Sequence, residues 1–101
     1  MRYKVAILPT AWEDLKQIED YYFIQVDINT ALKVTDNILS AIERLEQFPD
    51  SGSLTPDGWL NEMGYRMVIC EKHVAIYKRI DEVVYMYHIA DTQTEYTKLF
   101  Y

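Results

Sequence analysis

Residues 65–90 read YRMVICEKHVAIYKRIDEVVYMYHIA, and this stretch decides the fold. It contains three runs rich in β-branched and aromatic residues, at 65–70, 73–80 and 83–90, and each gap between them is two residues long. Such runs are typical of strands, and two-residue gaps are typical of hairpin turns, although neither Glu71-Lys72 nor Asp81-Glu82 contains the favoured Gly or Asn. The stretch therefore predicts a three-stranded antiparallel meander.

The residues before this meander predict one strand and two helices. A strand from Tyr3 to Leu8 stops at Pro9, and Thr10 and Glu13 then have the spacing of a capping box, with Thr10 as N-cap. Asp27 or Asn29 can cap the second helix. Two sets of apolar residues recur at three- and four-residue steps and so mark one face of each helix: Ala11, Leu15, Ile18 and Tyr22 in the first, and Ala31, Val34, Ile38, Ala41, Ile42, Leu45 and Phe48 in the second.

The connection between these helices is short, so we expect an antiparallel helical hairpin that ends before Pro49. Residues 50–58 have the composition of a loop, and residues 92–101 are expected to form a short C-terminal helix or tail. The chain is thus predicted to be a single α/β (α+β) domain over residues 1–101, with the helices on one face of the sheet.

Composition and charge narrow the functional classes. The net charge is −6, with −4 in residues 1–50 and −2 in residues 51–101, so direct DNA binding is not expected of this chain alone. A local basic excess lies in residues 64–80, where the plainer interpretation is a solvated strand edge. No signal peptide or membrane-spanning run is recognised, and a lone Cys70 fits a reducing compartment. We therefore expect a cytoplasmic protein without a membrane partner.

Several polar residues are candidates for a site, each with a structural alternative. Arg66 could face a target, or could pair with Glu62 or Glu71. His73 could serve recognition, although an exposed histidine at a turn is the plainer expectation. His88 alternates with Val84, Met86 and Ala90 and is expected at the edge of the core. Cys70, His73, His88 and Asp91 could be drawn as a metal site, but one Cys and two His on different strands argue against it, so no metal or other cofactor is expected.

The chain resembles the RelE/ParE superfamily of bacterial toxins along nearly its whole length. The opening is similar in Leu8-Pro9, Ala11, Asp14-Leu15, Ile18 and Tyr21-Tyr22. Leu45, Phe48-Pro49 and Gly52 resemble the end of the family's second helix, and Gly64-Tyr65-Arg66, His73 and Tyr77-Lys78 resemble a ParE-type stretch. The last strand and tail are similar in Val84 to Ile89 and in Glu95-Tyr96 and Leu99-Phe100.

This resemblance implies the toxin of a type II toxin–antitoxin (plasmid stabilisation) module, neutralised by an antitoxin segment that folds around the hairpin and sheet. The nuclease branch cleaves ribosome-bound mRNA with basic and aromatic side chains, and here Arg66, with His88 or Tyr96, would supply the catalytic groups. Val74 stands where that branch usually has Arg, and residues 91–94 lack its basic tail. The ParE branch, whose members inhibit DNA gyrase by binding, is the better match. A diverged, non-toxic antitoxin binder is a third alternative.

The residues that could bind the target or the antitoxin come from the basic stretch at 64–80 and from the Gly-flanked segment before it, which contains a tryptophan. Tyrosines are unusually frequent, and with Trp59 they suit a protein interface. The candidates for contact with gyrase, the ribosome or the antitoxin are Arg66, His73, Lys78, Arg79 and Trp59.

Overall fold

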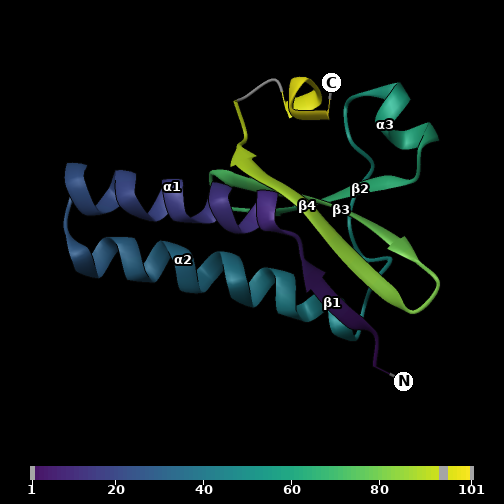
Figure 1. Cartoon of the computed structure of the whole chain (residues 1–101), viewed down its shortest axis with the longest axis horizontal. Coiled ribbons are helices and arrows are strands. Elements are labelled where there is room, and N and C mark those ends of the chain that lie inside the picture. The colour runs from purple at the N-terminus through teal and green to yellow at the C-terminus, as the bar shows by residue number, and fades with distance from the viewer. Residues whose placement is uncertain (1, 94–95, 101) are drawn as a thin grey trace.

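The computed structural model describes residues 2–93 and 96–100, but not the side chains of residues 96 and 97. A four-stranded sheet has two long helices on one face and two short helices on the other (Figure 1). The strands are β1 (Lys4–Ile7), β2 (Tyr65–Cys70), β3 (His73–Ile80) and β4 (Val83–Asp91). The helices are α1 (Pro9–Gln25), α2 (Ile28–Glu43), η1 (Arg44–Glu46), α3 (Gly58–Glu62) and η2 (Tyr96–Phe100).

The sheet has the order β1-β4-β3-β2, with β1 parallel to β4 and the remaining pairs antiparallel. The predicted meander is confirmed, and its last strand runs one residue further, to Asp91. Glu71 and Asp81, the first residues of the two turns, have positive φ angles of 56° and 54°. Each turn thus places a non-glycine residue in the left-handed region that Gly or Asn adopts more easily.

The helical hairpin is confirmed, but its first cap differs from the prediction. Asp27 caps α2 by accepting a 2.6 Å hydrogen bond from the Thr30 backbone N–H. The predicted Thr10 cap is wrong, because α1 begins at Pro9 with Leu8 as N-cap. Proline lacks the N–H that a first helical turn leaves unpaired, so it suits this position. Thr10 instead donates a 2.7 Å hydrogen bond from its hydroxyl to the Tyr87 carbonyl.

The end of the second helix also differs from the prediction. The helix ends at Glu43 and continues as η1, well before Pro49. Phe48 is 61% exposed, although the apolar periodicity placed it on the buried face. The other apolar positions behave as expected, because Ala31, Ile38, Ala41, Ile42 and Leu45 are all buried. The periodicity therefore predicted the buried face of the helix correctly but extended it about one turn too far, to Phe48.

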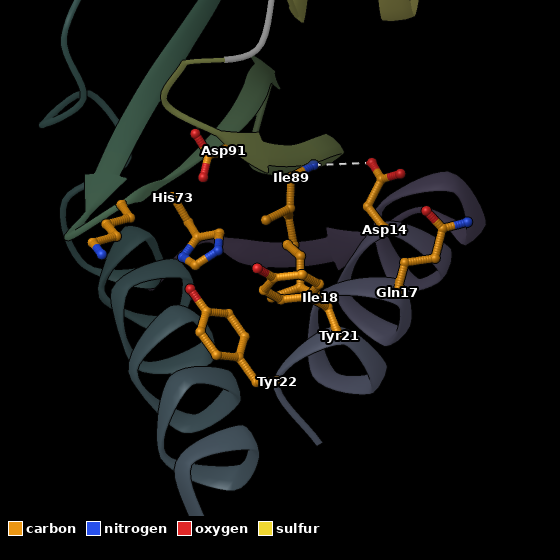
Figure 2. A pocket seen from close by; sticks show the side chains of 9 residues that line it. Asp14, Gln17, Ile18, Tyr21, Tyr22, His73, Ile89 and Asp91 are labelled. Atoms are coloured by element: carbon orange, nitrogen blue, oxygen red, sulfur yellow. Dashed lines mark hydrogen bonds between the residues drawn. The ribbon is translucent and has the colours of Figure 1, made fainter. Parts of the chain in front are cut away.

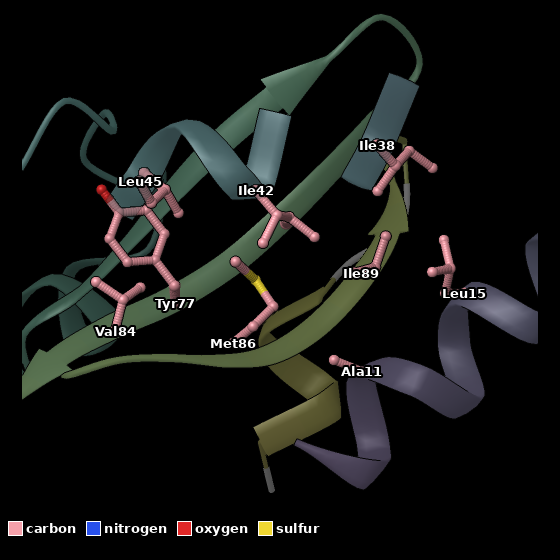
Figure 3. Close-up of a cluster of buried hydrophobic side chains, with 10 residues drawn as sticks. Ala11, Leu15, Ile38, Ile42, Leu45, Tyr77, Val84, Met86 and Ile89 are labelled. Carbon is pink, nitrogen blue, oxygen red and sulfur yellow. The ribbon is translucent and has the colours of Figure 1, made fainter. Parts of the chain in front are cut away.

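One core fills the space between the long helices and the sheet (Figure 3). Its buried side chains are Ala11, Leu15, Ile38, Ile42 and Leu45 from the helices and Ala75, Tyr77, Val84, Met86 and Ile89 from the sheet. A second, smaller core lies on the opposite face, where Leu60, Val74, Ile76 and Ala90 pack with Tyr65, Met67 and Phe100. Both faces of the sheet are therefore covered.

A bulge in β4 changes which residues share a face. Tyr77 pairs with Met86, whereas the preceding Ile76 pairs with His88, so Tyr87 has no partner in the register. The extra residue shifts the alternation. His88 therefore lies with Ile76 on the face of the smaller core, and Ile89 lies with Met86 on the helical face. The prediction that His88 shares a face with Val84 and Met86 is wrong for this reason.

A short helix, α3, lies just after the predicted loop and was not predicted. Asp57 caps it by accepting a 2.9 Å hydrogen bond from the Leu60 N–H, and Leu60 is fully buried. Thr55 and Asn61 close the segment, since the Asn61 Oδ1 accepts from the Thr55 N–H at 2.8 Å and from its hydroxyl at 2.9 Å. One buried leucine and local polar bonds thus hold a helix too short to show periodicity. Across the described residues, no helix has the length and apolarity to span a membrane.

Candidate functional site

The N-terminal part of α1 continues the hydrogen bonding of the β4 edge after β1 ends. The Leu8 N–H donates to the Met86 carbonyl at 3.0 Å, as the strand register requires. The Asp14 Oδ2 then accepts a 3.1 Å bond from the Ile89 N–H and lies 2.8 Å from the His88 Nδ1. Asp14 therefore satisfies a backbone donor that a longer β1 would otherwise pair.

Next to this contact, a pocket of about 430 Å³ lies between α1 and the ends of β3 and β4 (Figure 2). We call it the α1 pocket. Its apolar floor consists of Ile18 and Ile89, and its remaining lining is polar or aromatic: Asp14, Gln17, Tyr21, Tyr22, Lys72, His73 and Asp91. It joins buried and charged side chains with aromatic rings, and it is our candidate site.

His73 is the most buried polar residue of the α1 pocket. It is 7% exposed, and its ring meets that of Tyr22 edge-on at 5.9 Å between centroids. Burial lowers the pKa of His73 below its ordinary value of 6.5; Lys72 adds to this effect, while Asp91 and Glu71 oppose it. The imidazole is therefore neutral at neutral pH. The expectation of an exposed histidine at a turn is wrong, because α1 and Tyr22 cover the start of β3.

Sequence reasoning missed most residues of the α1 pocket. Asp14, Gln17 and Tyr21 follow one another at helical spacing, beside the stripe that forms the buried face of α1. Because that stripe packs on the sheet, the neighbouring stripe must lie along the rim of the interface. The spacing was therefore visible in the sequence, but its meeting with Lys72 and Asp91 depends on the packing of α1 against the β2–β3 turn.

Arg66 lies on the helical face of β2, opposite Tyr77 in the register. Its Nη1 donates a 3.2 Å hydrogen bond to the Gly52 carbonyl, whereas the sequence suggested Glu62 or Glu71 as a partner. Arg79 lies on the same face of the neighbouring strand, with its Nε 3.1 Å from the Asp50 Oδ1. These two cations thus bind the loop after η1.

Lys78 and Trp59 lie on the opposite face, with the smaller core. The Lys78 ammonium is 5.3 Å from the centre of the Tyr65 ring, within the range of a cation–π contact. Trp59 belongs to α3 and is 40% exposed. Because Arg79 and Lys78 are consecutive on a strand, they point to opposite faces, so the basic stretch does not form one patch.

The three groups proposed for RNA cleavage are not brought together where they can be located. Arg66 is on the helical face of β2, whereas His88 is on the other face of β4, two strands away. His88 is held there by Asp14 and by an edge-on contact of 5.1 Å with the Phe100 ring. The Tyr96 side chain lies outside the described residues. Within the described part of the chain, no group of three or more His, Cys, Asp or Glu residues could hold a metal ion.

A second exposed feature is the end of the helical hairpin, which extends past the sheet (Figure 1). It combines large apolar side chains that are at least half exposed, up to 73% for Ile24. We call this group the apolar hairpin tip: Tyr21, Phe23, Ile24, Val26, Ile28 and Leu32. Large exposed apolar side chains gathered at one end of a hairpin are typical of a protein interface.

Comparisons with known proteins agree with this architecture. The family described as "ParE toxin of type II toxin-antitoxin system, parDE" matches residues 5–96. A solved chain of the chromosomal ParDE toxin–antitoxin system from P. aeruginosa superposes with a TM-score of 0.78 at 19% identity, covering 91% of this chain and 98% of that one. A chain of the RelBE2 toxin–antitoxin complex from Mycobacterium tuberculosis gives 0.65 at 15% identity, covering 90% and 99%. A search of curated proteins gave no match.

The two structural relatives share the fold, and the family match covers most of the sequence, from β1 to the start of η2. The resemblance recognised in the separate motifs is thereby confirmed. The chain belongs to the family of ParE toxins of type II toxin–antitoxin systems.

Proposed function

We propose that this toxin arrests bacterial growth in the cytoplasm by binding DNA gyrase, as part of an addiction module that stabilises a plasmid or chromosomal locus. The observation that carries the proposal is the separation of Arg66 and His88 on opposite faces of the sheet. RNA cleavage requires a base, an acid and cations around one phosphate. Because Arg66 and His88, the two candidate groups that the structure describes, lie apart, binding to a surface of the target is the simpler mode of action.

A cognate antitoxin is the proposed partner. Both structural relatives come from toxin–antitoxin systems or complexes. The apolar hairpin tip supports an extensive protein contact, because covering exposed apolar side chains is favourable in water. The α1 pocket continues this surface, since Tyr21 belongs to both. An antitoxin segment that folds on binding would cover the hairpin tip and neighbouring sheet.

For the target, we propose the face that carries Trp59 and Lys78. A half-exposed tryptophan and a lysine near the same face suit a protein contact with some acidic character. Replacing Trp59 or Lys78 by Ala should then weaken gyrase inhibition in a protein that still folds. Arg66 and Arg79 hold the loop after η1, so their replacement by Ala should lower stability as well.

The first test is induced expression in a bacterium without the antitoxin, with labelled thymidine and labelled methionine followed together. The proposal expects thymidine incorporation to fall first, and purified protein to inhibit supercoiling of relaxed plasmid by gyrase. An earlier fall of methionine incorporation would contradict the proposal and favour ribosome-dependent mRNA cleavage, with Arg66→Ala as the next variant. If neither falls, the chain is a diverged member that no longer arrests growth.

A further inference from the structure

The α1 pocket is lined by a buried polar side chain, His73, which is 7% exposed. The His73 ring meets the Tyr22 ring edge-on at 5.9 Å between centroids. Figure 2 shows the imidazole directed into the hollow that Tyr21, Tyr22 and Ile18 border. The pocket therefore presents an imidazole ring to any group that enters the hollow.

We propose that the α1 pocket binds an arginine side chain of a protein partner, with the guanidinium between Asp91 and Asp14 and beside His73. This inference rests on the proposed function, because the partner that would carry the arginine is the antitoxin. It goes further than the proposed function in naming the residue type that anchors the interface.

Charge selects a cation over an anion. Asp14 and Asp91 contribute two carboxylates to the lining, against the single ammonium of Lys72, and the imidazole is neutral. An anionic ligand would meet both carboxylates in a half-enclosed site, where like charges repel strongly. An apolar ligand would remove water from Asp14 and Asp91 without making a hydrogen bond to either carboxylate. A cationic donor satisfies the carboxylates and also the unprotonated nitrogen of the imidazole.

Shape and lining select arginine over lysine. Ile18 and Ile89 form an apolar floor that suits the methylene groups of a long side chain. Tyr21 and Tyr22 meet edge-on at 5.3 Å and 88°, so their rings present faces in two directions, and Tyr21 is 60% exposed. A planar guanidinium stacks on such a face and donates in several directions within its plane, whereas an ammonium is a compact point charge.

The carboxylates have capacity left for this ligand. Asp14 uses Oδ2 for its contacts with Ile89 and His88, and Asp91 uses Oδ1 to accept from the Gln93 N–H at 2.8 Å. Each carboxylate therefore has a second oxygen for the guanidinium. An Asp91→Asn variant keeps an oxygen for the Gln93 N–H, so it removes the charge while preserving the local fold. Asp20, an exposed carboxylate of the same helix outside the lining, offers a matched control.

The test is an NMR titration of the full-length protein with Nα-acetyl-arginine N-methylamide, and with the neutral citrulline analogue as its isostere. We expect saturable shifts of the His73 imidazole and Tyr21 and Tyr22 ring signals, at a Kd on the order of millimolar. The citrulline analogue should bind at least about tenfold more weakly, since it lacks the charge. Asp91→Asn should weaken arginine binding about fivefold or more, and Asp20→Asn should not. Equal binding of both analogues, or no saturable shift at His73, would overturn the proposal.

A second measurement tests the source of the arginine and separates this inference from the proposed function. Each arginine of the antitoxin is replaced by Gln, and its affinity is measured for the unchanged toxin and for Asp91→Asn. One replacement should weaken binding about tenfold to the unchanged toxin and much less to Asp91→Asn, as a double-mutant cycle reports for a direct contact. Full neutralisation without any such arginine would overturn the pocket proposal and leave the toxin function intact. Arginine binding without growth arrest would overturn the toxin function alone.

Discussion

The Tyr77 hydroxyl accepts a 3.0 Å hydrogen bond from the Gly52 N–H, and this contact fastens the loop after η1 to the centre of the sheet. A Cβ atom on Gly52 would lie 2.3 Å from that hydroxyl oxygen and 2.7 Å from the Met67 carbonyl oxygen. The Gly52 carbonyl in turn accepts the bond from Arg66. Only glycine fits at position 52, because the Tyr77 side chain and the Met67 backbone both lie too close to it to leave room for a Cβ atom.

Replacing Gly52 by Ala should therefore destabilise the protein by about 1–3 kcal/mol, the usual cost of forcing extra atoms into a packed site. The measurement is urea-induced unfolding followed by tryptophan fluorescence. Gly58→Ala is the matched control, because a Cβ there meets nothing within 4 Å and Gly58 opens α3. Equal stability of the two variants would contradict the packing argument.

Replacing Asp14 by Ala should destabilise the protein by about 1–3 kcal/mol, because the Ile89 N–H then loses its acceptor at a partly buried position. Asp14→Asn should lose clearly less stability, since its amide oxygen can still accept that hydrogen bond. Glu13→Ala, at an exposed neighbouring position, serves as the control. Hydrogen exchange adds a local measurement: the Ile89 amide should exchange faster in Asp14→Ala than in Asp14→Asn, and similar rates would show that the side chain is dispensable.

His73 should make stability depend on pH. Its pKa is lowered in the folded state, chiefly by burial, so the unfolded chain binds a proton more readily. The contribution of neutral His73 is therefore complete above its ordinary pKa of 6.5 and is lost as pH falls through its lowered folded-state value. We expect Tm to fall more between about pH 7.5 and 5.5 in the unchanged protein than in His73→Gln, which does not titrate. Parallel pH profiles would show that His73 is not the cause.

The fold could be predicted from sequence wherever one physical signal dominated. Strand composition located the meander to within one residue, and apolar spacing located the buried faces of α1 and α2. Local exceptions escaped prediction. The bulge at Tyr87 is one of them, because no property of residues 83–90 alone reveals it.

The candidate site was less predictable for a related reason. His73 has the sequence context of an exposed turn, and its burial arises from Tyr22, about fifty positions earlier in the chain. Arg66 and His88 both looked like members of one catalytic set, yet strand alternation and the bulge place them on opposite faces. Sequence motifs identified the family, while the positions of the polar groups depended on register and long-range packing.

The complex with the antitoxin should depend weakly on salt. The toxin carries a net charge of −6, so its overall charge would repel an acidic partner. The apolar hairpin tip instead favours an interface that is stabilised by burial of apolar side chains. One arginine in the α1 pocket is partly shielded and adds only a small salt effect. We expect Kd to change less than about threefold between 0.1 and 0.5 M NaCl.

Leu32→Ala should weaken the complex about tenfold, whereas Lys33→Ala, at the neighbouring exposed position, should leave it nearly unchanged. A steep salt dependence, or a larger loss from Lys33→Ala than from Leu32→Ala, would mean that charge pairs hold the partners together instead of apolar burial.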